Sequence, residues 1–235
     1  MNRSPRLRSS KFAIALFAAV ALAPHSIADE YAIPDPSRTL IDEVEQAYER
    51  AEAAESSGDV VGSTAILEWV VFESHAGLAA ATLKEIEITV ESAGISRAIK
   101  RYAIPTGVVT RAYSELGERY LTNGYAGAAL PLLSVAAVQR SRSLLDAIQA
   151  EDPSYEFETL SHALVRARNI RNTFKYLNEI DVLKDPNLYR DLLNLGLAMR
   201  QTDSQDRART LLGIVAGEAA AGPLRDLARK ELEAM

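Results

Sequence analysis

The chain contains no cysteine, and this absence excludes several kinds of chemistry. Disulfides, thiolate metal sites, a cysteine nucleophile and a bacterial lipid anchor all need that side chain. Glycine and proline are also few, 12 and 9 among 235 residues, which argues against a turn-rich all-β protein. The 48% of hydrophobic and 25% of charged residues exclude wholesale disorder. The composition is therefore typical of a globular, helical protein.

The first 28 residues have the pattern of a secretory signal peptide. Four basic side chains precede the apolar run 12–23. As a helix this run would span only about 18 Å, short of the roughly 30 Å core of a bilayer. Small residues at Ser26 and Ala28 favour cleavage between Ala28 and Asp29. We therefore expect a periplasmic or secreted protein with no stable membrane insertion after cleavage, and an uncleaved anchor is the alternative.

Cleavage would leave a more acidic protein. The leader carries four basic and no acidic residues, so its removal changes the formal net charge from −6 to −10. A surface of this sign repels nucleic acid and anionic lipid unless it has a local basic patch. Two groups of basic residues are candidates for such a patch: Arg97, Lys100 and Arg101, and Arg166, Arg168, Arg171 and Lys175. Acidic neighbours make the second group typical of a solvated helix face, and we expect no nucleic-acid partner.

Apolar residues recur at intervals of three and four along most of the chain, which predicts helices. Residues 29–37 predict an extended lead-in because they contain two prolines. Glycine, proline and cap residues separate the expected helices at about 38–57, 60–76, 78–92, 95–102, 108–122, 125–149, 155–183, 187–201, 205–220 and 224–235. The alternating run 86–90 could form a strand, but it has no evident partner strand. We therefore expect one all-α domain of antiparallel helical hairpins over residues 38–235.

Two windows of the sequence repeat each other with an offset of 79 residues. The first contains Tyr113, Leu116, Gly117, Tyr120, Ala129 and Leu133, and the second contains Leu192, Leu195, Gly196, Met199, Ala208 and Leu212. The Gly and Ala positions let two helix backbones approach, and the large residues fill the space between neighbouring turns. A third, degraded copy starts near Ala47.

This pattern resembles the tetratricopeptide repeat (TPR), whose signature has a large residue, Leu-Gly and an aromatic residue, then Ala and an apolar residue on the second helix. The clearest copies cover about 110–143 and 189–222, and a longer, irregular helical pair is expected between them, over about 143–185. The resemblance implies a short TPR-like α-solenoid of stacked hairpins, whose first helices form a concave binding face. The second copy departs from the pattern where Asp203 replaces the glycine found at Gly124. An ordinary pair of helical hairpins is the alternative.

The TPR-like register directs eight side chains toward the concave face: Arg111, Ser114, Glu118, Leu121, Arg190, Leu193, Leu197 and Arg200. Leu193 and Leu197 would be apolar residues at exposed positions, which suggests contact with a partner. The alternative is that the middle helix or the C-terminal helix covers them as part of the core. The resemblance thus predicts a non-catalytic scaffold or adaptor in the cell envelope that binds a protein or peptide.

No pattern in the sequence predicts a catalytic, cofactor or metal site. His75 and His162 lie in different segments, and neither has a histidine one helical turn away. Glu-Ser pairs at Glu55, Glu73 and Glu91 resemble the acid of lytic transglycosylases, but the segment that should follow is missing. We expect no enzyme activity. A cell-wall glycan hydrolase or its accessory factor is the alternative function, and self-association as a homo-oligomer is a third possibility.

Overall fold

The computed structural model describes residues 38–74, 76–102, 107–173 and 186–235. In these ranges the regular structure consists of ten helices: α1 (Arg38–Ser56), α2 (Val60–Phe72), α3 (Ala80–Ala93), α4 (Ile95–Arg101), α5 (Thr110–Thr122), α6 (Ala126–Glu151), α7 (Leu160–Thr173), α8 (Pro186–Gln201), α9 (Gln205–Glu218) and α10 (Pro223–Glu233). The all-α prediction is confirmed for this part of the chain. The expected leader, its cleavage site between Ala28 and Asp29, and the lead-in 29–37 lie outside the described residues.

Most helix boundaries lie within two residues of the expected ones, but α2 ends at Phe72 and not near residue 76, and α7 begins later than expected. The expected end of the 155–183 helix lies outside the described residues. The periodicity predicts a helix from Tyr155, but α7 begins only at Leu160. The chain turns at Asp152, whose carbonyl accepts a hydrogen bond from the Tyr155 amide at 2.9 Å. Thr159 then starts the new helix, because its hydroxyl accepts a hydrogen bond from the His162 amide at 3.2 Å. The run 86–90 lies inside α3, so the helical interpretation of that segment is confirmed.

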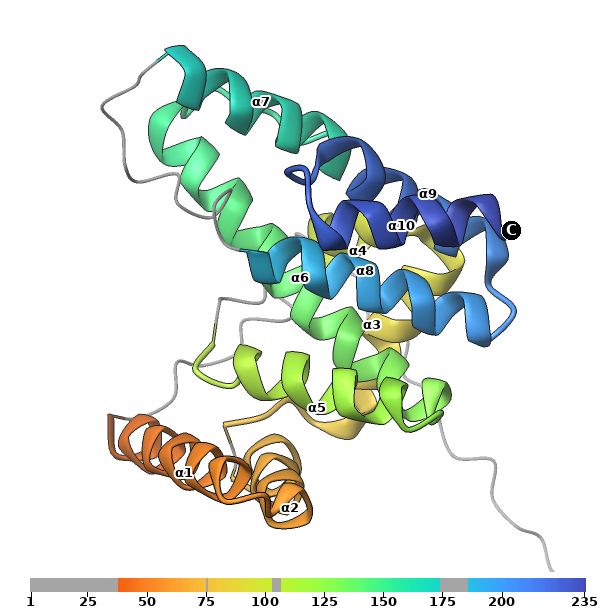
Figure 1. Ribbon diagram of the computed structural model, residues 1–235. Helices are drawn as coiled ribbons and strands as arrows, with labels where there is room; N and C mark the ends of the chain where they lie inside the picture. Colours follow the sequence, from red (N-terminus) through yellow and green to blue (C-terminus); the bar gives the residue numbers. More distant parts are fainter. Residues whose placement is uncertain (1–37, 75, 103–106, 174–185) are drawn as a thin grey trace, which may run out of the picture.

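Three antiparallel hairpins, α1–α2, α5–α6 and α8–α9, follow one another through the fold (Figure 1). α2 packs on α5, α6 packs on α8, and α10 packs on α9. α6 is the central helix, because α3, α4 and α7 also pack against it. The first helices of the hairpins touch through single side chains: Tyr48 of α1 contacts the start of α5, and Ser114 of α5 contacts Asp191 of α8.

The three hairpins close with the same turn. The first helix of each ends with a hydrogen bond of 2.8–2.9 Å from an amide to a carbonyl five residues earlier: Asp59 to Ala54, Tyr125 to Tyr120 and Ser204 to Met199. The residue before each donor has a left-handed backbone, with φ of 86° at Gly58, 82° at Gly124 and 65° at Asp203. This is the Schellman arrangement that satisfies the last carbonyls of a helix. Asp203 therefore replaces the glycine of the other two turns but has the same left-handed backbone conformation. Aspartate adopts this conformation more readily than most residues.

The left-handed backbone at Asp203 makes a testable difference to stability. We expect Asp203→Gly to raise the free energy of unfolding by about 0.5–1 kcal/mol, because glycine has no Cβ that opposes this conformation. The reverse change, Gly124→Ala, is expected to cost about 1–2 kcal/mol. A Cβ at Gly124 would meet nothing within 4 Å, so this cost comes from the backbone alone. Urea denaturation followed by circular dichroism measures both changes. If Asp203→Gly lowered the free energy of unfolding, the left-handed backbone at Asp203 would not be strained.

Glycine lies where the helices of a hairpin cross. A Cβ on Gly117 would lie 2.7 Å from Cγ of Leu133, and one on Gly196 would lie 3.1 Å from Cγ of Leu212. The same places in the first hairpin are taken by Ala51 and Leu67, which are both buried. The predicted role of these two glycines at helix crossings is confirmed.

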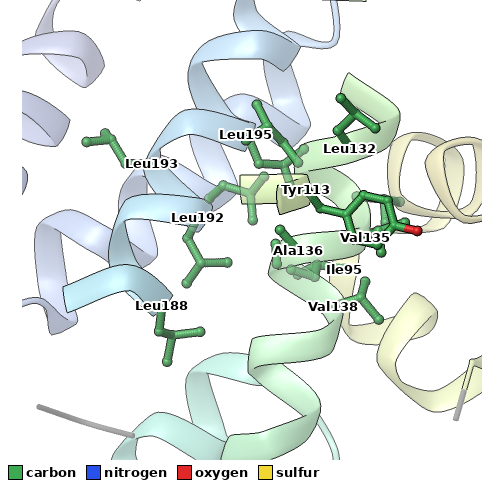
Figure 2. Close-up of a cluster of buried hydrophobic side chains, with 14 of the residues drawn as sticks. Ile95, Tyr113, Leu132, Val135, Ala136, Val138, Leu188, Leu192, Leu193 and Leu195 are labelled. Atoms are coloured by element: carbon green, nitrogen blue, oxygen red, sulfur yellow. The ribbon is translucent and has the colours of Figure 1, made fainter. Parts of the chain in front are cut away.

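Apolar side chains from all three hairpins join one core. Figure 2 shows its middle, where Leu188, Leu192 and Leu195 of α8 lie toward the apolar side of α6. α2 differs from the other helices because it is apolar on most sides, and Val61 and Phe72 remain exposed on its surface. No helix of the described residues is long and apolar enough to cross a membrane.

Candidate functional site

A groove of about 500 Å³ lies where the first helices of the hairpins meet. α1 contributes Glu55, α2 contributes Val60 and α8 contributes Arg190, while the rest of the lining comes from α5 and its end: Arg111, Glu115, Glu118, Arg119, Thr122 and Asn123. Three of the eight residues that the TPR-like register directs toward the concave face are therefore brought together here, namely Arg111, Glu118 and Arg190.

Two buried tyrosines hold α5 in place beneath the groove. The Tyr48 hydroxyl donates a hydrogen bond to the Val108 carbonyl at 2.8 Å and accepts one from the Ala112 amide at 3.1 Å. The Tyr113 hydroxyl accepts a hydrogen bond from the Leu78 amide at 2.6 Å. Burial raises the pKa of Tyr113 to about 12, so its hydroxyl stays protonated at neutral pH. The groove is thus built on a helix whose start is fixed from two sides.

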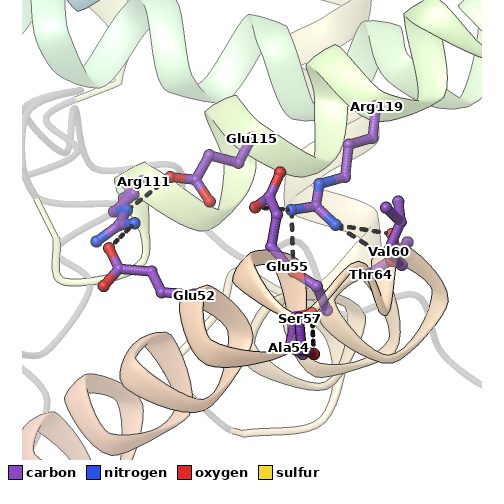
Figure 3. Close-up of polar contacts among 10 residues, drawn as sticks. Glu52, Ala54, Glu55, Ser57, Val60, Thr64, Arg111, Glu115 and Arg119 are labelled. Atoms are coloured by element: carbon purple, nitrogen blue, oxygen red, sulfur yellow. Dashed lines mark hydrogen bonds and ion pairs between the residues drawn. The ribbon is translucent and has the colours of Figure 1, made fainter.

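Arg111 is fully engaged by neighbouring carboxylates (Figure 3). Its Nε donates to Oε1 of Glu115 at 2.6 Å, and its Nη2 donates to Oε1 of Glu52 at 2.5 Å. Its guanidinium also lies over the ring of Tyr48, 5.1 Å from the centroid. The hydrogen bond to Glu115, followed by that to Glu52, raises the pKa of Arg111 above its ordinary value. Arg111 therefore links α1 to α5.

Arg119 joins the end of α5 to the first hairpin. Its Nη2 lies 2.8 Å from Oε2 of Glu55 and 3.0 Å from Oγ of Ser63, and its Nη1 lies 2.9 Å from Oγ1 of Thr64 (Figure 3). The Arg119 side chain is only 15% exposed. These contacts make Arg119 a structural side chain at the edge of the groove.

Glu118 and Arg190 differ from the other charged residues that line the groove. Within the described residues, neither side chain has an ion-pair or hydrogen-bond partner. Beside Arg190, the Asp191 carboxylate is fully buried, and it accepts hydrogen bonds from the Ser114 hydroxyl and from Nε of Arg140, the latter at 2.5 Å. This buried contact fixes α8, and with it Arg190, against the middle of α5.

No protein-family model, curated protein or solved structure matches the chain. The function therefore has to be inferred from the groove itself and from the hairpins that form it.

The TPR-like register does not predict exposure correctly for part of the expected concave face. Ser114, Leu121 and Leu193 are only 5%, 8% and 2% exposed, so the expected exposure is wrong at these positions. Ser114 is covered because its hydroxyl bonds Asp191, and Leu121 belongs to the core. Leu193 lies on the side of α8 that faces away from α6 (Figure 2).

α10 closes the remainder of this face. It packs against α9 and α8, and its Glu231 forms an ion pair with Arg200. Leu197 is partly buried and packs against the core. The alternative that the C-terminal helix covers this part of α8 therefore describes the structure better than an open surface does.

The eight positions predicted for the concave face include none from the first hairpin, although its Glu55 and Val60 line the groove. Glu52 and Glu55 lie 66 residues before Glu118 and Leu121, so they occupy the same register positions in the degraded copy. Applying the register to that copy would have found both carboxylates. Their pairing with Arg111 and Arg119 had no comparable signal, because it depends on how the hairpins pack.

The candidate catalytic residues do not gather in a pocket. Glu55 is 58% exposed and paired with Arg119, Glu73 is exposed at the end of α2, and Glu91 accepts a hydrogen bond from Ser204 at 3.1 Å. His162 is half exposed near Glu158, and His75 lies outside the described residues. The part of the chain that the structure describes contains no cluster of three metal-binding side chains.

The second basic group is partly neutralised by acidic side chains. Arg166 lies 2.6 Å from Asp152, and Arg168 pairs with Glu218. The side chains of Arg171 and Lys175 lie outside the described residues.

Proposed function

We propose that this chain is a non-catalytic, TPR-like scaffold or adaptor of the cell envelope, periplasmic or secreted, that binds a protein or peptide in the groove over α5. The observation that carries the proposal is the meeting of Arg111, Glu118 and Arg190 in one groove. The repeat register selected eight residues from the sequence alone, and these three of the eight line the groove.

The hairpin geometry supports the repeat interpretation. Equivalent turn hydrogen bonds and left-handed residues recur at offsets of 66 and 79, and glycine meets leucine at the helix crossings of the second and third hairpins. Repeats of this kind place their first helices in one layer, and that layer is the surface with which repeat proteins bind ligands. α10 follows α9 in the place of a further first helix and presents polar residues to solvent, as a terminal cap does.

A binding role suits the charges of the groove better than a catalytic role does. Arg111 and Arg119 are held in ion pairs between helices, and the groove is open rather than enclosed in apolar walls. A general acid on a glycan would need a carboxyl shielded from water, whereas Glu55 and Glu73 are exposed. The surroundings of these carboxylates therefore give the glycan-hydrolase alternative no support.

Photo-crosslinking in living cells tests the proposal. We expect a photoreactive amino acid at position 118 to give a discrete crosslinked product, since a partner in the groove would lie against this side chain. Adding Arg190→Glu should lower the yield of that product about fivefold, because it reverses an exposed charge of the groove and so removes its electrostatic complementarity to a bound partner. Gel electrophoresis and mass spectrometry would measure the product and identify the protein attached.

Position 209 on α9 provides the matched control, because its arginine is exposed and lies outside the groove. Equal products from positions 118 and 209, or no product from position 118, would count against a partner in the groove. Circular dichroism of each variant would exclude loss of the fold as the cause.

A further inference from the structure

The exposed side of α2 is apolar, and the helix beside it, α1, is acidic. We infer that this side of the first hairpin binds a basic amphipathic helix of a partner protein. The apolar side of that helix covers α2, and its lysine or arginine side chains pair with carboxylates of α1. This site shares no lining residue with the groove over α5, so it is a second binding surface beyond the proposed function.

Three residues form an apolar stripe along α2, namely Val61, Ala65 and Phe72. Their positions lie within about 40° of one another around a helix of 3.6 residues per turn. Val61 is 82% exposed and Phe72 is 55% exposed, and Ala65 is exposed as well. A continuous apolar stripe with polar residues at its border is typical of a protein interaction surface.

A groove of about 480 Å³ lies between α1 and α2 at the border of this stripe. Its lining consists of Trp69 of α2 and of Glu43, Gln46, Glu49 and Arg50 of α1. Trp69 follows Ala65 by about one helical turn, so the groove adjoins the stripe. An indole ring beside carboxylates suits a lysine or arginine side chain, because the charge pairs with the carboxylates while the methylene chain lies on the ring.

The charge of α1 favours a basic partner. This helix carries six carboxylates and two arginines. Within the described residues, Glu43 and Glu49 have no ion-pair or hydrogen-bond partner, while Nε of Arg50 donates to the Gln46 carbonyl at 3.4 Å. The same carboxylates would repel an acidic partner, an anionic lipid surface or the α1 helix of a second copy.

The second hairpin shows how helices cover the equivalent face. At the offset of 66 residues, Trp69 and Phe72 correspond to Val135 and Val138 of α6, which are fully buried. α3 and α4 pack against α6, and Figure 2 draws Ile95 of α4 in the same buried cluster as the two valines. In the first hairpin, Phe72 stays exposed instead.

α4 is itself a short basic amphipathic helix. Its buried residues are Ile95, Ala98 and Ile99, and its exposed basic residues are Arg97, Lys100 and Arg101. This side of a second helix therefore accepts a helix of the inferred type within the same fold.

The fluorescence of Trp69 provides the test, because this residue is the only tryptophan of the chain. The probes are two synthetic amphipathic peptides with leucines at positions i, i+3, i+4 and i+7, one with lysine and one with glutamate on the polar side. In titrations at low salt, we expect the lysine peptide to move the Trp69 emission to shorter wavelength. It should bind about tenfold more tightly than the glutamate peptide.

Two variants separate the acidic part of the surface from the apolar part. Glu43→Lys combined with Glu49→Lys should reverse the preference between the peptides, and Phe72→Ser should weaken both by about fivefold. Glu158→Lys combined with Asp206→Lys is the control, because it makes the same change in net charge at exposed positions outside the groove. It should leave the preference unchanged, and circular dichroism would show that each variant is folded.

Equal affinity of the native protein for the two peptides, or the same reversal in the control variant, would overturn the inference. A dimer in sedimentation velocity that Phe72→Ser dissociates would also overturn it, because a second copy would then occupy the surface. The crosslink from position 118 tests the groove over α5 by itself. Failure of the peptide experiment would therefore leave the proposed function standing, and failure of the crosslink would leave this second surface standing.

Discussion

Replacing Asp191 by alanine is expected to lower the free energy of unfolding by about 3–5 kcal/mol, more than we expect from any other single substitution in this protein. The Asp191 carboxylate is fully buried and accepts hydrogen bonds from Arg140 of α6 and Ser114 of α5. Removing it takes away the counter-charge of a guanidinium that is itself mostly buried. Urea denaturation followed by circular dichroism gives the change directly.

Asp206 is the matched control, because it is an aspartate whose side chain is fully exposed on α9. Asp206→Ala should change the stability by no more than about 0.5 kcal/mol. The double variant Asp191→Leu with Arg140→Leu should recover most of the loss, since apolar side chains can replace a buried ion pair at little cost. A loss below about 1 kcal/mol in Asp191→Ala would show that the ion pair does not join the second and third hairpins.

The second large effect is expected at the helix crossing in the second hairpin. Gly117→Ala should lower the free energy of unfolding by about 2 kcal/mol, although alanine favours a helix over glycine by about 1 kcal/mol. The new Cβ would lie 2.7 Å from Cγ and 2.8 Å from Cδ2 of Leu133, so the helices must separate or Leu133 must move. Gly196→Ala should cost less, because its contacts with Leu212 would be 3.1 Å. Thermal and urea denaturation measure both.

Gly213→Ala provides the control for helix propensity. Gly213 lies within α9, and a Cβ there would meet nothing within 4 Å, so the change should stabilise the protein by about 0.5–1 kcal/mol. Adding Leu133→Ala to Gly117→Ala should cost less than the sum of the two single changes, because the clash disappears with the leucine side chain. If Gly117→Ala stabilised the protein as Gly213→Ala does, close packing at this crossing would be contradicted.

The fold class and the hairpin crossings could be predicted because they depend on local patterns. Apolar spacing identifies helices, glycine at Gly58 and Gly124 identifies the turns, and Gly117 and Gly196 identify the crossings. Asp203 shows the limit of this approach, since its conformation equals that of the glycines although its sequence differs.

The candidate site could be predicted only in part, because exposure depends on elements distant in sequence. Arg190 is exposed and Leu193 is buried on the same helix, and the difference lies in how neighbouring helices cover α8. The ion pairs that engage Arg111 and Arg119 link α5 to a hairpin more than 50 residues earlier. Sequence periodicity contains no information about which of two exposed charges will find such a partner.

The local closure of each hairpin has a consequence for how the chain folds. The partners in each hairpin are near in sequence, so little chain entropy is lost before their contacts form, a topology associated with rapid folding. α6 contacts its own hairpin partner α5 and the following hairpin through α8, as well as α3, α4 and α7. Native-state amide hydrogen exchange should therefore be slowest in α6, while the two ends of the molecule open more often.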